Sequence, residues 1–432
     1  MLYPLLCLIV LFLSIVLWIY HWENPRCNGK LPPGSMGLPV AENQQVVYIM
    51  HELVMYGSLF KTSLVGRQIV VSTDTDVNRV IFQQKGKLVQ SWYMDSFDDI
   101  VGKENVLSSH GFLHKCLRNL ILNLFGSESL KEKQVSEMEE LTSKHLRLWS
   151  CQQPSMIYDF TVRKLFGCNN EKLRGCYSAF LDGLISFPLN IPGTAYWKCL
   201  QGRNKAMRVI KIMLEERRGT LTKKQDKDFL DVALEEMNKA GTILSEQTAL
   251  DLLFALPFAA FESASSAVVL ALQYLQSNPL ALAELTQEHE TILRERETKD
   301  SGITWKEYKS MTFTHMVINE TIRLGNIVPT IFRKVVKDIE IKDYNIPAGW
   351  IILACTTAVH LNPTKYKDPL TFNPWRWKGR ELNAGSKFFM GFGSGVRLRA
   401  GAEFVKLQIS SFLHHSVTNY RWTVMKEGMA VR

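Results

Sequence analysis

One stretch in the second half of the chain is almost free of charge. Between Asp251 and Glu284 the only charged residue is Glu262. Ser245, before this stretch, is a suitable N-cap, and Asn278-Pro279 is a stop signal, so the pattern predicts one long helix. Such a helix either lies inside a large helical domain or crosses a membrane. The acid at its centre argues against a membrane span, because it costs roughly 2.5–3.5 kcal/mol there.

The composition is that of a large folded protein. The chain has 432 residues, 46% of them hydrophobic, which excludes a disordered chain and allows a core that can enclose a hydrophobic cofactor. Its formal charge of +9 is spread out, which suits an anionic membrane surface better than a nucleic acid, and no nucleic-acid motif occurs. The eight cysteines show no metal-binding spacing, which indicates a reduced, cytosol-facing protein.

Periodicity elsewhere predicts mostly helices. Helical patterns are found at about 111–234, 311–324 and 401–413. Residues 68–72 and 330–358 are instead rich in β-branched side chains, which favour strands. The expected fold class is therefore mainly α with a smaller β-rich part, and not a βαβ alternation.

The N-terminus predicts a membrane anchor. Leu2–Tyr20 is apolar and uncharged, and a helix of this length spans about 28 Å, enough for the bilayer core. The first basic residues, Arg26 and Lys30, follow the span, so the positive-inside rule leaves the body in the cytosol. A retained signal peptide or a buried helix is the alternative. We divide the chain into an anchor, a proline-rich hinge and a catalytic body, at residues 1–22, 23–40 and 41–432.

Glu262 is followed directly by Ser263 within the long helix. An acid beside a hydroxyl, with small alanines around them, can relay protons to a bound ligand. The alternative is a structural glutamate whose hydrogen bonds are satisfied inside the protein, since an unpartnered carboxylate is costly in so apolar a helix. The pattern alone leaves both interpretations open.

Two further patterns also allow more than one interpretation. Glu320 and Arg323 share one helix face at i,i+3 spacing, which by default is a surface pair worth ~0.2–0.5 kcal/mol. Their helix is otherwise apolar, so a buried and structurally specific pair is credible. His414-His415 lies in an apolar run and is interpreted as part of the core or surface and not as a metal site.

Residues 392–401 contain three glycines and lead into a predicted helix. They imply a tight loop whose backbone closely approaches another group. A dinucleotide fingerprint fails because Val396 stands where the third glycine is needed, and a phosphate loop fails because no Gly-Lys-Ser/Thr occurs. What remains is a glycine loop at a helix N-terminus, beside a cofactor whose acidic groups Arg397 could hold.

In this order the motifs resemble the cytochrome P-450 superfamily of haem-thiolate monooxygenases. Among these, the chain looks like a plant membrane-bound member of the clan that oxidises triterpenoids, steroids and gibberellin-type diterpenoids. Glu320 and Arg323 match the family's Glu-x-x-Arg, and Arg376 matches the arginine that joins them in a buried triad. Glu262 and Ser263 match its oxygen-activation motif. Its haem-loop pattern, Phe-x-x-Gly-x-Arg-x-Cys-x-Gly, is matched at Phe392, Gly395, Arg397 and Gly401.

The resemblance implies a P-450 fold behind an N-terminal transmembrane helix, in the endoplasmic reticulum membrane with the body in the cytosol. It implies haem b as cofactor, electrons from NADPH through a reductase, membrane lipid around the anchor, a hydrophobic substrate and no nucleic acid. Catalysis would depend on Glu262 and Ser263. The haem propionates would be held by His114, Arg118, Arg333 and Arg397. The substrate pocket would draw on residues 91–109, 187–196 and the stretch after Arg323.

One departure from the family changes the chemistry, because Arg399 stands where the family has its iron-binding cysteine. A thiolate at a helix N-terminus binds iron and favours O–O cleavage. Arginine is a permanent cation with no lone pair to give, so it is not a competent ligand. The alternative function is therefore a catalytically dead, membrane-anchored relative that binds a lipophilic ligand or a partner. The chain is also shorter than the family between Pro39 and Phe60 and near residues 153–160.

Overall fold

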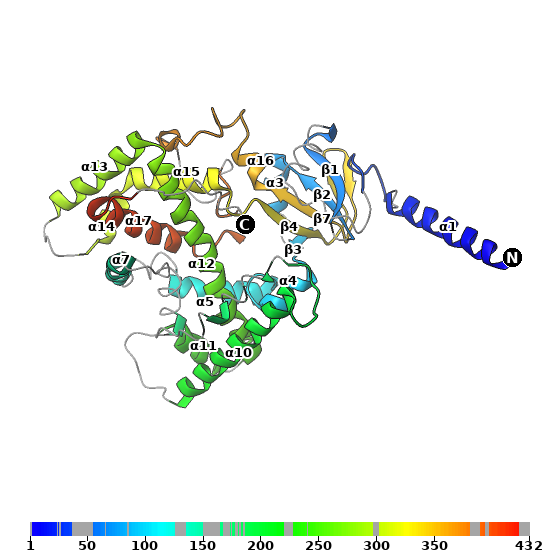
Figure 1. Cartoon of the computed structure of the whole chain (residues 1–432), viewed down its shortest axis with the longest axis horizontal. Coiled ribbons are helices and arrows are strands. Elements are labelled where there is room, and N and C mark those ends of the chain that lie inside the picture. Colours follow the sequence, from blue (N-terminus) through cyan, green and yellow to red (C-terminus); the bar gives the residue numbers. More distant parts are fainter. Residues whose placement is uncertain are drawn as a thin grey trace.

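The computed structural model describes most of the chain, namely residues 2–36 without 24 and 26, 55–125 without 65, 84 and 85, 135–149, 165, 166, 173, 175–177, 180, 183, 184, 186–219, 228–296 without 240, 302–380, 389–393 and 397–422. These residues form a helical body, a sheet at one side of it, and the separate helix α1 (Leu2–Glu23) (Figure 1). The expected class, mainly α with a smaller β-rich part, is confirmed. The helices of the body are α3 (Thr75–Gln83), α4 (Asp95–Val101), α5 (Gly111–Phe125), α7 (Val135–Trp149), α10 (Ala195–Gly219), α11 (Phe229–Met237), α12 (Glu246–Gln276), α13 (Pro279–Glu295), α14 (Trp305–Ser310), α15 (Thr312–Gly325), α16 (Thr356–His360), the 3-10 turn η2 (Pro374–Trp377) and α17 (Ala402–Asn419).

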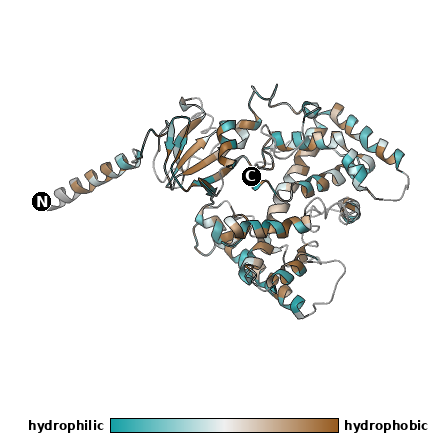
Figure 2. Cartoon of the chain, turned by 180° about the vertical axis from the view of Figure 1, so that it is seen from behind, coloured by the Kyte–Doolittle hydropathy of each residue, from teal (hydrophilic) through white to brown (hydrophobic). Residues whose placement is uncertain are grey.

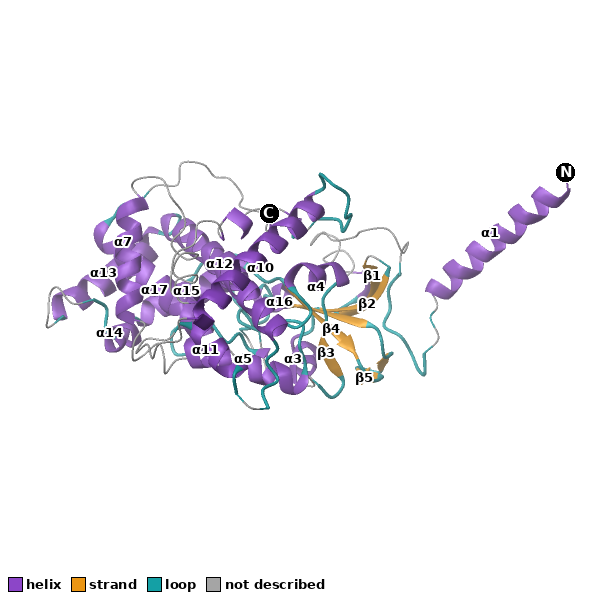
Figure 3. Cartoon of the chain, turned by 90° about the horizontal axis from the view of Figure 1, so that it is seen from below, coloured by secondary structure: helices purple, strands orange, loops and turns teal. Residues whose placement is uncertain are grey.

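The sheet joins strands from both ends of the chain. Its order is β1-β2-β7-β4-β3, and it lies on the side of the body that faces α1 (Figure 3). β2 and β7 run parallel and their neighbours pair antiparallel, with Ser91 opposite Arg333 where β3 meets β4. A separate hairpin joins β5 to β6. The strand bounds are β1 (Leu59–Leu64), β2 (Arg67–Ser72), β3 (Val89–Ser91), β4 (Thr330–Val335), β5 (Ile339–Ile341), β6 (Tyr344–Ile346) and β7 (Ile351–Cys355).

The long apolar helix is α12, which begins after Ser245 and ends at Ser277, as predicted. Ser245 Oγ accepts a hydrogen bond of 3.0 Å from the Thr248 amide. The helix continues through Pro257 and contacts α10, α15 and α17. Among the described residues, α12 is the helix whose length and hydropathy would allow it to cross a membrane. Its contacts on several sides identify it as the central helix of the body (Figure 1).

A chain of buried histidines joins the helices that pack beside α12. His289 of α13 and His414 of α17 bring their Nδ1 atoms to 3.0 Å. The other ring nitrogen of His289 lies 3.1 Å from Thr314 Oγ1 in α15. His415 Nε2 lies 3.3 Å from Glu139 Oε1 in α7. These histidines hold helices together, and no group of metal-binding side chains was found in the described part of the chain.

The proline-rich segment after α1 is docked on the sheet. The Lys61 amide of β1 donates to the Pro33 carbonyl at 2.7 Å, and Lys61 Nζ donates to the Glu23 carbonyl at 3.0 Å. Gly34 has φ +126°, and a side chain there would collide with the Lys61 carbonyl. Within α1 the apolar side chains of residues 10–20 are exposed, Phe12 to 66%, whereas Trp22 packs against the core of the sheet (Figure 2). Exposed apolar side chains along a helix are typical of a segment that contacts lipid.

We predict that the free energy of unfolding falls as the pH is lowered from about 6.5 toward 3. Burial lowers the pKa of His289 to about 3 and that of His414 to about 2. The unfolded chain binds these protons near pH 6.5 and the folded protein does not, so acid favours unfolding by up to about 1.4 kcal/mol per pH unit for each histidine. Urea unfolding between pH 4.5 and 7 measures this slope.

His414→Asn should make that slope shallower, whereas the control His21→Asn, at an exposed position of α1, should leave it unchanged. Equal slopes in the unmodified chain and in His414→Asn would contradict the prediction.

Candidate functional site

The glycine loop, of which the structure describes residues 389–393 and 397–401, lies between α15 and the start of α17. Phe392 is buried, and its carbonyl accepts a hydrogen bond of 3.0 Å from the Arg399 amide. A side-chain carbon on Gly391 would collide with Ile322 of α15, so the loop backbone packs directly on that helix. Gly393 has φ +79°, which favours glycine. Gly401 precedes α17, and the predicted Gly395 lies outside the described residues.

Arg397 reaches from this loop to the segment before α5. Its Nε is buried without a hydrogen-bond partner. Burial, with the positive charges of Arg333 and Arg118, lowers the pKa of Arg397 to about 10. Its guanidinium nitrogens donate to three backbone carbonyls. These belong to Val106 (3.2 Å), Leu107 (2.5 Å) and Ser109.

Arg333 comes to the same place from the sheet. It lies on β4 and is only 5% exposed. Its Nη1 donates to the Phe332 carbonyl at 2.8 Å, and its guanidinium lies 5.4 Å from the ring centre of Phe82. Its Nε, like that of Arg397, is buried without a partner. Burial lowers the pKa of Arg333, so the folded protein holds this cation at a cost in solvation.

Helix α5 contributes two of the predicted residues. His114 is buried. Arg118 is partly buried, and burial lowers its pKa. Among the described residues no carboxylate forms an ion pair with Arg118, Arg333 or Arg397, the three arginines that the sequence assigns to one ligand.

Arg399 adds a fourth cation. Its side chain is accessible to water, yet burial by surrounding protein atoms lowers its pKa. Water access and a lowered pKa are compatible when protein atoms surround the guanidinium without packing against it. The solvent-exposed fraction of the side chain is the better guide to how tightly it is packed. The Tyr93 hydroxyl opposes the lowering of the pKa of Arg333, Arg397 and Arg399, so it lies within electrostatic range of all three. Arg118, Arg333, Arg397 and Arg399 are called the arginine cluster below.

The haem group that the resemblance implies needs cations for its propionates and an electron-pair donor for its iron. Arg118, Arg333 and Arg397 fit the first need, because they are at least partly buried and two of their Nε atoms lack a partner. Arg399 does not fit the second, because a guanidinium has no lone pair to donate. The residues present fit the acidic edge of a haem and do not fit its metal.

The predicted proton-relay residues lie in the middle of α12. Ser263 Oγ donates to the Ala259 carbonyl at 3.0 Å, one turn earlier in the helix. That bond uses the hydroxyl proton and leaves the oxygen lone pairs able to accept another. Glu262 is part of the helix, and its side chain lies outside the described part of the structure.

Glu320 receives five hydrogen bonds inside the body. Arg323 donates to both of its oxygens, at 2.9 Å and 2.8 Å, and both side chains are 0% exposed. Arg376 Nε donates at 2.9 Å, the Asn373 amide at 3.0 Å and Trp377 Nε1 at 3.0 Å. A buried carboxylate is tolerated when its oxygens are satisfied in this way. The three residues of the predicted triad meet here, in the interior.

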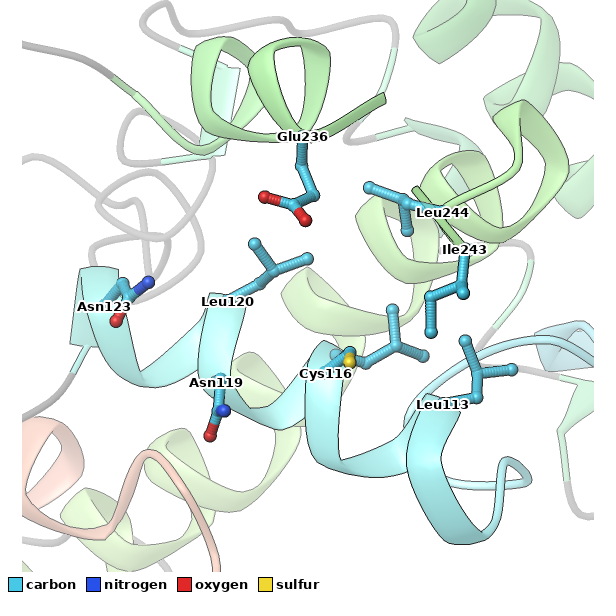
Figure 4. Close-up of a pocket in the computed structure, with 9 residues that line it drawn as sticks. Leu113, Cys116, Asn119, Leu120, Asn123, Glu236, Ile243 and Leu244 are labelled. Carbon is cyan, nitrogen blue, oxygen red and sulfur yellow. The ribbon is translucent and has the colours of Figure 1, made fainter. Parts of the chain in front are cut away.

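Two cavities lie apart from the arginine cluster. A cavity of about 450 Å³ contains Pro329 and Thr330, from the stretch after Arg323, together with residues of α16. A smaller one of about 160 Å³ lies between α5 and α11, where Glu236 points toward α5 (Figure 4). Its other lining residues are Leu113, Cys116, Leu117, Asn119, Leu120, Asn123, Ile243 and Leu244.

Sequence reasoning missed several residues of the site. Trp377 and Asn373 bind Glu320, and their segment was recognised although only Arg376 was assigned a role. Tyr93, within electrostatic range of three arginines, lies in the 91–109 stretch that the resemblance assigns to the substrate pocket, but no motif singles it out. The carbonyls that hold Arg397 carry no signal in the sequence, because any residue supplies one.

The chain is similar to known proteins over most of its length. The family model "Cytochrome P450" matches residues 177–431. Cytochrome P450 87A3 from Oryza sativa subsp. japonica is 46% identical over 441 residues, which cover 96% of this chain and 85% of that protein. Cucurbitadienol 11-hydroxylase from Siraitia grosvenorii is 40% identical over 440 residues, covering 96% of this chain and 92% of that protein.

A solved structure is similar in fold. It is the cyanobacterial CYP120A1 with retinoic acid bound, with a TM-score of 0.81 and 21% sequence identity. The match covers 90% of this chain and 92% of that one. The fold expected from the motifs is thereby confirmed.

We predict that Arg323→Ala destabilises the protein by ~3–5 kcal/mol, because it leaves the Glu320 carboxylate buried with an unpaired charge. The midpoint and slope of urea unfolding measure this change. Arg67→Ala is a matched control, since Arg67 pairs with Asp95 at 3.2 Å with side chains 56% and 84% exposed. The control should cost less than about 1 kcal/mol. A similarly small cost for Arg323→Ala would contradict the structural importance of the triad.

Proposed function

The chain belongs to the cytochrome P450 family. We propose that it has the fold and the haem-binding residues of a haem-dependent monooxygenase that acts on a hydrophobic triterpenoid or steroid-like substrate. The observation that supports this most is the match to a cucurbitadienol hydroxylase over 96% of the chain. The family reaction inserts one oxygen atom of dioxygen into a C–H bond, with electrons that NADPH supplies through a reductase. The proposed catalytic body is 41–432, behind the hinge at 23–40.

The proposed roles of the residues follow from their positions. Arg118, Arg333 and Arg397 bind the haem propionates, with His114 beside them on α5. When bound, haem supplies the site for oxygen activation. Glu262 and Ser263 would move protons along α12 toward that site. The Ser263 hydroxyl would accept a proton on a lone pair that its bond to Ala259 leaves free, and would give up its own proton toward the site by turning away from that carbonyl. Phe392, Gly395 and Gly401 shape the loop.

A further set of residues maintains the fold. Glu320, Arg323 and Arg376 hold α15 against the segment that contains η2. They lie in the protein interior and we assign them no contact with substrate. Their role is to keep the glycine loop, which packs on α15 through Ile322, in place.

The residue at position 399 determines whether the protein can catalyse this reaction. With a cation in place of the thiolate, the protein as it stands has no residue at this position that ligates iron. This residue is the basis of the alternative function, that of a membrane-anchored relative without catalysis that binds a lipophilic ligand or a partner. The sequence matches support the monooxygenase, so we propose that a cysteine at position 399 is what separates the two functions.

We predict that Arg399→Cys gives the ferrous–carbonyl complex the red-shifted absorption of a thiolate-bound haem. It should also allow hydroxylation of a triterpenoid such as cucurbitadienol when NADPH and a reductase are added. The thiolate would stand before α17, where the helix dipole favours an anion. Absorption spectra and product analysis by mass spectrometry measure the two effects.

The unmodified chain is the control, and it should give neither the thiolate spectrum nor turnover above background. Arg399→Ser, which removes the cation without adding a thiolate, should resemble the unmodified chain. A thiolate spectrum from the unmodified chain would show that our account of Arg399 is wrong. A well-folded Arg399→Cys variant that binds haem but oxidises no triterpenoid or steroid would contradict the proposed substrate class.

The protein is proposed to reside in the endoplasmic reticulum membrane with its body in the cytosol. The support is the apolar helix α1, with exposed side chains along its described part, and the basic residues Arg26 and Lys30 that follow it. Docking of residues 23–36 on β1 sets the body close to the membrane, where a hydrophobic substrate dissolves. The reductase partner would meet the protein on the same side.

We predict that the protein expressed in microsomes stays in the pellet through carbonate washing, because α1 spans the bilayer. Protease added outside the microsomes should digest the body. A variant without residues 1–22 is the control, and a larger fraction of it should be released by the same wash. A full-length protein that is released, or that is protected from protease, would contradict this topology.

A further inference from the structure

The arginine cluster presents positive charges and unpaired N–H donors, which are groups that can bind an acid without a metal. We propose that it is a site for a flat, amphipathic dicarboxylate, and that the unmodified chain therefore binds metal-free protoporphyrin at least as tightly as ferric haem. This inference rests on the proposed role of the arginines in holding carboxylates. It does not depend on the substrate class or on turnover.

Backbone contacts bring the cluster together. Arg333 on β4 lies opposite Ser91 on β3. The Ser91 carbonyl accepts a hydrogen bond of 3.0 Å from His110 Nε2. Arg397 donates to the carbonyl of the neighbouring Ser109. The sheet, the segment before α5 and the glycine loop thus meet at one place, and each provides or holds a guanidinium.

The two other arginines of the cluster, Arg118 and Arg399, lie close to this group. Arg118 lies on α5, which begins directly after His110, and its charge acts on Arg397. Arg399 follows Arg397 by two residues and shares the neighbour Tyr93 with it. The cluster therefore gathers four positive charges from three parts of the chain.

Within the described part of the chain these charges lack a protein counterion. No carboxylate in the described ranges pairs with any of the four arginines. Arg333 and Arg397 each keep a buried Nε that donates to nothing. Buried cations and orphaned donors are costly unless an anion neutralises them. Two or more carboxylates, each able to accept from a guanidinium fork, would satisfy this site.

Apolar side chains flank the charges. In the glycine loop, Leu398 packs on one hydrophobic cluster of the body and Ala400 on another. Arg397 and Arg399 alternate with them. Phe82 lies beside Arg333, and Phe392 is a buried residue of the loop. A ligand that fits this arrangement combines a broad apolar surface with acidic groups at its edge, which is the chemistry of a porphyrin dicarboxylate.

Arg399 sets the preference against the metal. It stands before the N-terminus of α17, where the helix dipole is positive, so both the side chain and the dipole repel a cation. Ferric haem carries a positive charge at its centre that the metal-free porphyrin lacks. Iron also gains no bond from a guanidinium. Removal of the metal therefore removes a repulsion and sacrifices no ligand bond at this position.

The test is a binding titration of the full-length chain in detergent micelles. Ferric haem is followed by absorbance and metal-free protoporphyrin IX by fluorescence quenching or enhancement. We expect the Kd of the metal-free porphyrin to equal or fall below that of haem. The dimethyl ester of protoporphyrin IX, whose carboxylates are capped, should bind at least about tenfold more weakly. Haem binding about tenfold tighter than the metal-free acid, or ester binding as tight as the acid, would overturn the proposal.

Substitutions separate the contributions of the arginines. Arg333→Gln should weaken binding of both free acids by about tenfold and leave the ester unchanged. Arg399→Gln, which removes the charge and adds no ligand, should shift the preference toward haem, and Arg399→Cys should shift it further. If Arg333→Gln leaves the affinity for both acids unchanged, or if Arg399→Gln leaves the preference unchanged, the proposal is wrong.

The outcome is distinguishable from that of the proposed function. An unmodified chain that rejects metal-free porphyrin, together with an active Arg399→Cys variant, would overturn this inference alone. Tight binding of metal-free porphyrin by the unmodified chain, together with a haem-bound but inactive Arg399→Cys variant, would overturn the hydroxylase proposal alone.

Discussion

The structure depends most on one buried carboxylate. Glu320 is fully buried and accepts five hydrogen bonds, from Arg323, Arg376 and two groups of the η2 segment. A charge without water is tolerated only when its partners are well placed, and removal of one partner leaves the penalty unopposed. Arg323 also donates to backbone carbonyls of three residues, His360, Pro369 and Thr371. The Glu320–Arg323 pair and its hydrogen bonds therefore fix α15 relative to the segment that runs from the end of α16 to η2.

The position of the functional site follows from that constraint. Ile322, next to Arg323 in α15, packs on the backbone of Gly391. His360, whose carbonyl Arg323 holds, accepts a hydrogen bond of 3.1 Å from the Met390 amide through Nε2. Both contacts place the start of the glycine loop. The far end of the loop is placed by Arg397, which binds carbonyls before α5. The loop is thus held from the interior at one end and from the cluster at the other.

Local signals in the sequence predict the helices well, because each signal acts over a few residues. Ser245 caps α12 as predicted, and Thr304 with Glu307 has the spacing of a capping box and forms one before α14. Partners that lie far apart in the chain could not be predicted from such signals. Nothing in the sequence shows that Ser91 faces Arg333, or which carbonyls Arg397 binds, because register and backbone acceptors depend on tertiary packing. The last helix also extends to Asn419, past the predicted Leu413, since buried polar residues continue its inner face.

If Arg399 replaces an iron ligand, as we propose, the fold does not depend on that ligand. The hydrogen bonds of residue 399 to the rest of the loop are made by its backbone: its amide donates to Phe392, and its carbonyl accepts from Ala402 at 3.3 Å. Neither bond depends on the side chain, and the side chain itself is accessible and does not fill the core. A change at this position therefore costs the loop little and alters the site profoundly, since it replaces an electron-pair donor by a cation. Because the loop backbone does not depend on the side chain of residue 399, we expect a cysteine introduced there to take the same backbone conformation.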